Sequence, residues 1–327
     1  MRCGQVGIKR LDNPFLILYT GIMIKNFKSI ADFLAYFKDE ETCQEYFEQI
    51  RFQDGEYCPH CGNVLVYRYK NGKRFRCSAC KQDFTIKTGT VFGESKISLQ
   101  KWFIAIYLLT TAKKGISSLQ LAKQVGVTQK TAWFMDHRLR KALKQNQLKL
   151  FGEVEMDETY VGGREKNKHR SKRTKGTQGR NTKTKTPVFG MIERKGKIKA
   201  TVVENVKMKT LEKEIVEHVK IGTKLYTDEL LSYSKIGTLY PHETVKHGHG
   251  EYVRGNVHSN SIESFWALFK RGYYGTYHTM SKKHLQRYVD EFVYRFNRRD
   301  DELSEVFSDI INRVSNTEKL PYKALLA

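Results

Sequence analysis

The sequence predicts an α/β protein with a small cysteine-rich β module and a helical region ahead of its main domain. Two tight cysteine pairs lie within residues 57–92, apolar residues recur at helical spacing over 97–145, and strand-like and helix-like segments alternate from about residue 150 onward. Strands that alternate with helices are typical of a layered α/β architecture. With 39% apolar and 12% aromatic residues, the chain can build real cores.

The chain is strongly basic. Its 327 residues include 58 Lys and Arg against 35 Asp and Glu, which gives a formal net charge of +23. Such a field favours nucleic acid or an anionic membrane as partner. No apolar run reaches the roughly 18 residues needed to span a bilayer, and the basic stretches lack an apolar helical face. We therefore expect double-stranded DNA, and no membrane, as the partner.

The first 52 residues are expected to form a tail and a helical lead-in. The start of the chain has basic residues followed by a short apolar run, as a signal peptide would, but it lacks the small-residue cleavage site. Met23 is a second possible start of translation. Six cysteines are few for a disulfide scaffold and suit metal binding in a reducing compartment. We expect an intracellular protein, cytoplasmic and nucleoid-associated in a prokaryote or nuclear in a eukaryote.

The cysteine-rich module, residues 53–95, has the spacing of a metal site. Its four cysteines, in two C-x2-C pairs separated by fifteen residues, are Cys58, Cys61, Cys77 and Cys80. Two such turns on a hairpin supply the ligands of a tetrahedral zinc site. Free thiols or disulfides are the alternative, and His60 could replace one cysteine. A closed four-thiolate site leaves no position for substrate, so the pattern predicts one structural Zn²⁺.

Residues 96–148 contain three segments with helical periodicity. The second ends at Gly126, and the third begins at Thr128, a residue type that caps helix N-termini. A helix, a short turn with glycine and a second helix led by polar residues form the helix-turn-helix pattern of DNA-binding proteins. The residues that would face the major groove or its phosphates are Gln129, Lys130 and Trp133. An ordinary helical hairpin is the alternative.

Residues 149–315 show the alternation of an α/β domain, and 316–327 are expected to be a C-terminal tail. The expected elements are a strand at 153–157, a hairpin over 188–206, a helix over 208–220, a strand at 223–229, a short helical segment, a strand near 242–248 and a helix over 260–273. This order predicts a sheet with helices packed on it.

A basic loop interrupts this domain at residues 164–185, where ten residues are Lys or Arg and almost none is apolar. Such a run is usually a solvated, flexible loop. We expect it to contact backbone phosphates, which needs no order in the free protein. The cations assigned to this role are Arg164, Lys168, Arg170, Lys172 and Arg173.

Acidic residues lie at the ends of three elements. Asp157 is on the first strand, Asp228 follows the strand after the helix, and Glu263 is on the late helix. Phosphoryl transfer with two metal ions needs carboxylates that converge from rigid elements. Each residue also has a simpler interpretation: Asp157 as a strand-edge charge, Asp228 as a helix cap, and Glu263 as the capping-box partner of Asn260.

Two further acidic residues flank Asp157. Because side chains alternate along a strand, Glu155 would share the face of Asp157, whereas Glu158 would point the other way. We interpret Glu158 as a plain surface charge.

Four segments together resemble a known family. They are the ribbon "CPHCG…FRCSACKQDFTIKTGTVF", the strand "GEVEMDETYVGG", the segment "LYTDE" and the helix "HSNSIESFWALFKRGYYGTYH". In this combination the chain resembles the DDE-type insertion-sequence transposases of the ISXO-like group, from about Phe47 to Asn297. The resemblance implies a ribonuclease-H-like mixed sheet with flanking helices, preceded by a zinc ribbon and a helix-turn-helix region.

The resemblance also implies the roles of individual residues. The triad that holds two Mg²⁺ or Mn²⁺ ions would be Asp157, Asp228 and Glu263. Glu263 is preferred over Asn260, which would support it, because an anionic oxygen suits Mg²⁺ better than an amide. Lys270, on the same helical face as Glu263, would contact a phosphate, and Arg271 would bind DNA beside it.

The function implied is that of a transposase. It would bind the terminal inverted repeats of its element, cleave the 3′ ends with Mg²⁺ and transfer them to target DNA, as a homodimer or larger assembly. Two alternatives are open. One is a DNA-binding regulator whose ribonuclease-H-like domain is inactive, and the other is a nuclease of this fold that never joins strands.

Overall fold

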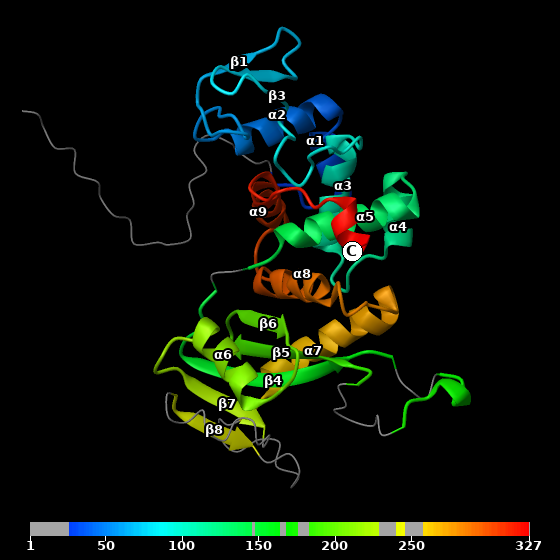
Figure 1. Ribbon diagram of the computed structural model, residues 1–327, viewed down its shortest axis with the longest axis vertical. Coiled ribbons are helices and arrows are strands. Elements are labelled where there is room, and N and C mark those ends of the chain that lie inside the picture. The colour runs from blue at the N-terminus through cyan, green and yellow to red at the C-terminus, as the bar shows by residue number, and fades with distance from the viewer. Residues whose placement is uncertain are drawn as a thin grey trace, which may run out of the picture.

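The computed structural model describes residues 26–145, 148–163, 168–175, 183–228, 240–245 and 258–326, with Asp228 and Val245 described by their backbone alone. Three parts follow one another along the molecule: a small β module, a helical region and a larger sheet (Figure 1). Arg164, the N-terminal tail and the helical segment expected after Asp228 lie outside the described residues. Within the described parts of the chain, we find no helix with the length and apolar character needed to cross a bilayer.

Two helices precede the β module. α1 spans Ile30–Tyr36 and α2 spans Glu40–Arg51. Ser29 and Asp39 cap these helices, because each side-chain oxygen accepts a backbone N–H of the following turn. The lead-in expected from the sequence is therefore a pair of well-capped helices.

The β module is a three-stranded antiparallel sheet with the order β1-β2-β3. Its strands are β1 (Val66–Arg68), β2 (Phe75–Cys77) and β3 (Asp83–Phe84). Phe75 and Phe84 are paired across the strands, and their rings stack with centroids 5.2 Å apart. Because so small a sheet has little apolar core, it depends on a further constraint such as a metal.

The helical region is built around buried aromatic rings. Its helices are α3 (Leu99–Thr111), α4 (Ser118–Val125), α5 (Gln129–Ala142), α9 (Leu303–Ser315) and the short α10 (Tyr322–Leu326). Phe307 of α9 lies 5.4 Å from Phe33 and Phe37 and 5.5 Å from Phe103, measured between ring centroids. The sequence groups α9 with the α/β domain, whereas in the structure its apolar face completes the helical core.

The larger sheet has five strands in the order β6-β5-β4-β7-β8. They are β4 (Glu153–Val161), β5 (Thr186–Glu193), β6 (Ile198–Val202), β7 (Lys224–Asp228) and β8 (His242–Val245). β4, β5 and β6 form an antiparallel meander, and β7 and β8 extend it in parallel from β4. This topology is the ribonuclease-H-like mixed sheet that the sequence resemblance implies.

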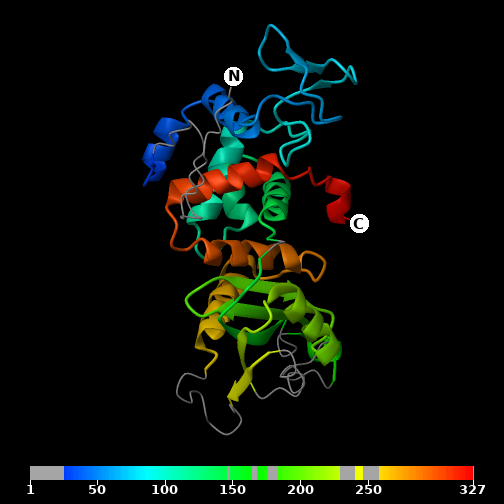
Figure 2. The same ribbon diagram turned by 90° about the vertical axis from the view of Figure 1, so that its left-hand side faces the viewer.

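Helices cover both faces of this sheet (Figures 1 and 2). One face packs on α6 (Met208–His218). The other packs on α7 (Asn260–Gly272) and α8 (Leu285–Asn297), with the irregular turn Tyr273–Tyr277 between them. The fold class predicted from the sequence is confirmed.

α8 also joins the sheet to the helical region, because α5 lies against its other side. Arg140 of α5 donates from Nε to Oε2 of Glu291 at 2.6 Å, and both side chains are almost completely buried. Arg295 and the Tyr277 hydroxyl occupy the other carboxylate oxygen at 2.7 and 2.9 Å. Since removal of one partner would leave an uncompensated buried charge, this contact fixes α5 against α8.

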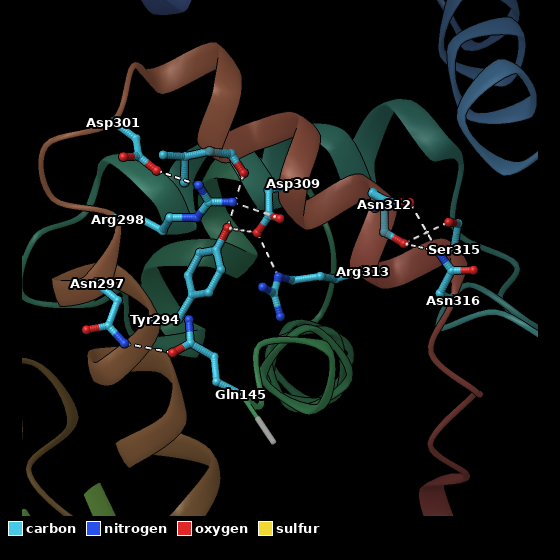
Figure 3. A network of polar contacts seen from close by, with 11 residues as sticks. Gln145, Tyr294, Asn297, Arg298, Asp301, Asp309, Asn312, Arg313, Ser315 and Asn316 are labelled. Carbon is cyan, nitrogen blue, oxygen red and sulfur yellow. Dashed lines mark hydrogen bonds and ion pairs between the residues drawn. The ribbon is translucent and has the colours of Figure 1, made fainter. Parts of the chain in front are cut away.

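A second polar network connects the end of α8 to α9 (Figure 3). Asp309 accepts the Tyr294 hydroxyl at 2.7 Å and pairs with Arg298 at 2.8 Å and Arg313 at 2.6 Å. Burial alone would raise the pKa of Asp309, but the neighbouring guanidinium groups and hydrogen bonds hold that pKa below its usual value. Consecutive helices that belong to different cores are thus tied together.

α7 approaches the sheet closely at Gly190 of β5. A Cβ atom at this position would lie 2.5 Å from Cζ2 of Trp266 and 2.9 Å from Cδ1 of Ile262. Gly190 is paired with Asp157 across β4 and β5. Because residues paired in an antiparallel ladder share a face, α7 covers the face of the sheet that carries Asp157.

We expect Gly190→Ala to lower the free energy of unfolding by about 2 kcal/mol, because the new methyl group overpacks a rigid indole ring. Urea denaturation followed by circular dichroism measures the change. Gly163→Ala is the control, since its Cβ would meet no atom of the described residues within 4 Å. Equal stability of the two variants would contradict the close packing of α7.

Candidate functional site

Asp157 lies near the middle of β4 and is half-buried. Its face of the sheet is the one that α7 covers, as its pairing with Gly190 establishes. The neighbouring residues Val154 and Met156 point to the other face and pack in the cluster that includes α6. Asp157 is therefore held on a rigid strand, on the face of the sheet that α7 covers.

Asp228 is the last residue of β7, the strand beside β4. Glu155 pairs with Tyr226 in the parallel ladder, so Asp157 and Asp228 each lie two residues beyond a paired position. The backbones of the two acidic residues consequently occupy the same level of adjacent strands.

Glu263 lies in the first turn of α7 and is exposed. The Ser259 hydroxyl donates to its Oε1 at 3.1 Å. Ser259 is the N-cap residue of α7, so a capping box between Asn260 and Glu263 is not formed. Asn260 is exposed at the first position of the helix, and Lys270 is exposed two turns beyond Glu263.

The cap of α7 comes from the sheet. Glu155, fully buried, accepts the backbone N–H of Ser261 at 2.8 Å and of Ile262 at 3.2 Å on Oε2. The Ser261 hydroxyl donates to Oε1 at 3.1 Å, and Nδ1 of His258 lies 3.2 Å from the same oxygen. A carboxylate on β4 thus satisfies the free amides at the start of the helix that carries Glu263.

Arg194, which follows β5, supplies the positive charge for this buried carboxylate. Its Nε donates to Oε1 of Glu155 at 3.0 Å, and its Nη2 donates to the carbonyl oxygen of His258 at 3.1 Å. Its guanidinium carbon lies 3.9 Å from the ring centroid of Tyr226, and Tyr226 in turn donates to Glu153 at 2.6 Å. We call Glu155 and Arg194 together the Glu155–Arg194 pair.

The interpretation of Glu158 as a surface charge is wrong. Glu158 does point away from Asp157, but only 7% of its surface is exposed. It is paired with Phe189, whose side chain packs in the cluster that includes α6. The second face of the sheet is therefore covered at Glu158, whereas Asp157 on the first face is half-buried.

Sequence reasoning missed the role of the Glu155–Arg194 pair. The alternation along β4 correctly places Glu155 on the face of Asp157, but its partners on α7 are 106 and 107 residues further along the chain. The sequence carried no signal for it, because Ser259 and Asn260 are both residue types that cap helices; only the structure shows that Ser259, the N-cap residue, makes no side-chain cap hydrogen bond. A helix start without its own cap needs an acceptor from elsewhere.

The helix-turn-helix geometry is present in α4 and α5. Gly126 ends α4 with a left-handed conformation, φ 67°, and Thr128 caps α5. Gln129 and Lys130 are exposed, and Lys130 Nζ lies 5.1 Å from the ring centroid of Tyr322. The second half of α5 is buried, so only its first turn can enter a groove.

Trp133 has a packing role in addition to any contact with DNA. Its ring is half-buried and lies edge-on to His137 and His284, with centroids 4.5 and 5.6 Å away. Desolvation by burial lowers the pKa of His137 to about 2. Neutral His137 and Trp133 thus help to join α5 to the start of α8.

Four of the five basic-loop cations assigned to phosphate contacts are described, and all four are solvent-exposed. They are Lys168, Arg170, Lys172 and Arg173, with Arg170–Lys172 in a short 3₁₀ turn. Arg173 Nε donates to the carbonyl oxygen of Lys168 at 3.0 Å, which closes this turn. Arg271, at the end of α7, is also exposed.

The four cysteines of the β module converge. Cys58 and Cys80, and likewise Cys61 and Cys77, have sulfur atoms 3.6 Å apart, and all four sulfurs lie within 4.8 Å of one another. Disulfide sulfurs are about 2.05 Å apart, whereas a tetrahedral Zn²⁺ with ligands at 2.3 Å needs sulfurs about 3.8 Å apart. The cluster fits a closed, structural zinc site, and exposed His60 is not among its described members.

Comparisons with known proteins agree with this geometry. Residues 149–297 match the family model of the ISXO2-like transposase domain, and residues 38–83 match that of the transposase zinc-ribbon domain. An uncharacterized protein in transposable element ISH50 of Halobacterium salinarum is 32% identical over 274 residues, which cover 79% of this chain and 91% of that protein. The crystal structure of a pre-cleavage Mos1 transpososome matches 67% of this chain and 80% of its own chain, with 12% identity and a TM-score of 0.23.

We expect Cys77→Ser to abolish stoichiometric zinc, because the remaining three thiolates no longer close the tetrahedron. Plasma mass spectrometry of the purified protein measures the zinc content. Cys43→Ser is the control, since Cys43 is buried in α2 and is not in the cluster. One zinc per chain in Cys77→Ser would rule out the four-thiolate site.

Proposed function

The chain belongs to the family of ISXO2-like transposases, and we propose that it carries out the complete DNA chemistry of transposition. It binds the terminal inverted repeats of its element, releases the 3′ ends by Mg²⁺-dependent hydrolysis and joins these ends to target DNA. The observation that supports this most is the level placement of Asp157 and Asp228 on adjacent parallel strands, with the start of α7 on the face of Asp157.

The donor set suits Mg²⁺. Asp157, Asp228 and Glu263 all offer carboxylate oxygens, the ligands that Mg²⁺ prefers, and they come from two strands and one helix. We propose that these three residues hold two ions. When bound, such ions neutralise charge on the scissile phosphate and activate the attacking oxygen.

The residues of the chain itself supply positioning. Glu263 projects from the first turn of α7, where the Ser259 hydroxyl orients its carboxylate. Lys270 lies two turns further along the same helix and is exposed, so it is available to bind a DNA phosphate. Asn260, one turn before Glu263, supports the site without replacing the carboxylate. The nucleophiles are water and then a DNA 3′-hydroxyl, so no covalent enzyme intermediate is needed.

DNA binding begins at the first turn of α5. Gln129 and Lys130 are exposed there, and half-buried Trp133 lies one turn further along the helix. The basic loop and Arg271 add contacts to backbone phosphates, in keeping with the +23 charge. Because two element ends must be joined together, we propose a dimer or larger assembly on DNA.

We expect Asp157→Asn, Asp228→Asn and Glu263→Gln each to reduce cleavage and joining at least about a hundredfold, because each removes an anionic metal ligand. End-labelled DNA that carries the element's repeats, incubated with Mg²⁺ or Mn²⁺, gives both rates. Binding of the same DNA should stay near the wild-type level.

Glu212→Gln on the exposed side of α6 is the control and should behave as wild type. Full activity in any of the three variants would show that its carboxylate is not a ligand. Binding without cleavage in the wild type would identify a DNA-binding regulator, and cleavage without joined products would identify a nuclease.

We expect Lys130→Ala to weaken binding to repeat DNA about tenfold, as removal of one groove or phosphate contact does. Fluorescence anisotropy at a fixed salt concentration measures the affinity. Lys213→Ala, an exposed lysine of α6, is the matched control for a change of one charge. If both variants bound equally well, the first turn of α5 would not be the reading element.

A further inference from the structure

We propose that the Glu155–Arg194 pair is a positioning device for the proposed active site. It fixes the start of α7, and therefore Glu263, against the two strands that carry Asp157 and Asp228. The effect on catalysis rests on the proposed function, whereas the contacts themselves are properties of the fold.

Glu155 is suited to positioning and not to holding a metal. Both of its oxygens already accept hydrogen bonds from the chain, two of them from the backbone amides at the start of α7. The N-terminal amides of a helix carry partial positive charge, which a buried carboxylate matches. Glu155 is fully buried, whereas Asp157 on the same face is half-buried and Glu263 is exposed.

Arg194 extends the contact to a third element. Its guanidinium donates to Glu155 on β4 and to the His258 carbonyl just before α7, and it stacks on Tyr226 of β7. Tyr226 is two residues before Asp228 on the same strand. A planar group with several donors can meet all three elements at once, which the single ammonium group of a lysine cannot.

The position of Glu155 explains why its contact with the start of α7 affects the proposed active site. Glu155 and Asp157 are one pleat repeat apart, about 7 Å along the strand, and Ser261 and Ile262 immediately precede Glu263. A shift at the start of α7 therefore moves Glu263 relative to Asp157. Active-site groups must be held within about 0.5 Å of the productive geometry, so a small shift reduces metal affinity.

Hydrogen exchange tests the contact without any metal. In Glu155→Gln the side chain loses its charge and keeps one acceptor oxygen. Its NH₂ group then opposes either the amides of Ser261 and Ile262 or the Arg194 Nε and Ser261 hydroxyl donors, so the contact with the start of α7 is weakened in both orientations. We expect these two amides to exchange at least about tenfold faster than in wild type, while amides in the second half of α7 keep their protection. Unchanged exchange at both positions would overturn the proposal.

The metal dependence of binding and cleavage tests whether the Glu155–Arg194 pair positions the proposed metal ligands. We expect Glu155→Gln and Arg194→Lys to weaken Mn²⁺ binding, measured calorimetrically, about tenfold and to raise the Mg²⁺ concentration for half-maximal cleavage similarly, as loss of an outer-shell partner does. DNA affinity and zinc content should stay at wild-type values, which separates positioning from general unfolding. Ser261→Ala, which removes one hydroxyl contact to Glu155, is a milder variant that should shift both values in the same direction.

Glu193→Gln is the matched control. Glu193 also accepts two backbone amides, from Phe151 at 2.9 Å and Lys197 at 3.2 Å, but these lie outside α7. The Glu193→Gln substitution should leave the Mn²⁺ affinity and the hydrogen exchange of the Ser261 amide unchanged. If the wild type cleaves DNA and all the pair's variants match it in metal dependence, the positioning role fails while the function stands. If the wild type does not cleave, the function fails, and hydrogen exchange with Mn²⁺ binding still decides the positioning role.

Discussion

The arrangement of the α/β domain depends on one buried carboxylate at the start of a helix. Glu155 has no exposed surface, and burial of an unpaired carboxylate would cost several kcal/mol. It is tolerated because the amides of Ser261 and Ile262 and the guanidinium of Arg194 replace water. These partners belong to different elements. Satisfying one charge therefore brings together β4, the end of β5 and α7.

Internal pairing of acids also explains how a chain with a net charge of +23 holds acidic clusters. Glu291 is fully buried between Arg140 and Arg295, in the same way as Glu155 is paired with Arg194. The carboxylates that serve structure are neutralised inside the protein. The exposed cations of the basic loop and of α5 are left to create the positive field that attracts DNA.

The sequence predicted what depends on local pattern. The strand beginning at 153, the hairpin, the helix from 208 and the helix from 260 all appear in the structure, because hydrophobic periodicity and turn residues act over short distances. The cysteine spacing likewise predicted the sulfur cluster. Residues whose environment is made by distant segments could not be predicted: Glu158 is buried on the face of the sheet that packs on α6, and Glu155 finds its partners on α7 more than a hundred residues away.

The sequence likewise could not predict that α9 belongs to the helical core. The way in which α8 and α9 pack matters for the relation between DNA binding and catalysis. α8 presents Val289, Phe292 and Val293 to the sheet, while Tyr294 packs in the helical core with α9. One helix thus contributes side chains to two cores, and Arg140 ties it to α5, whose first turn is proposed to read DNA. Shared helices transmit displacement as rigid bodies, because packed cores resist compression. If α5 reads DNA as proposed, DNA that orients α5 orients the sheet and Asp157 with it, which is what a protein needs if it cuts at a fixed distance from the sequence that it recognises.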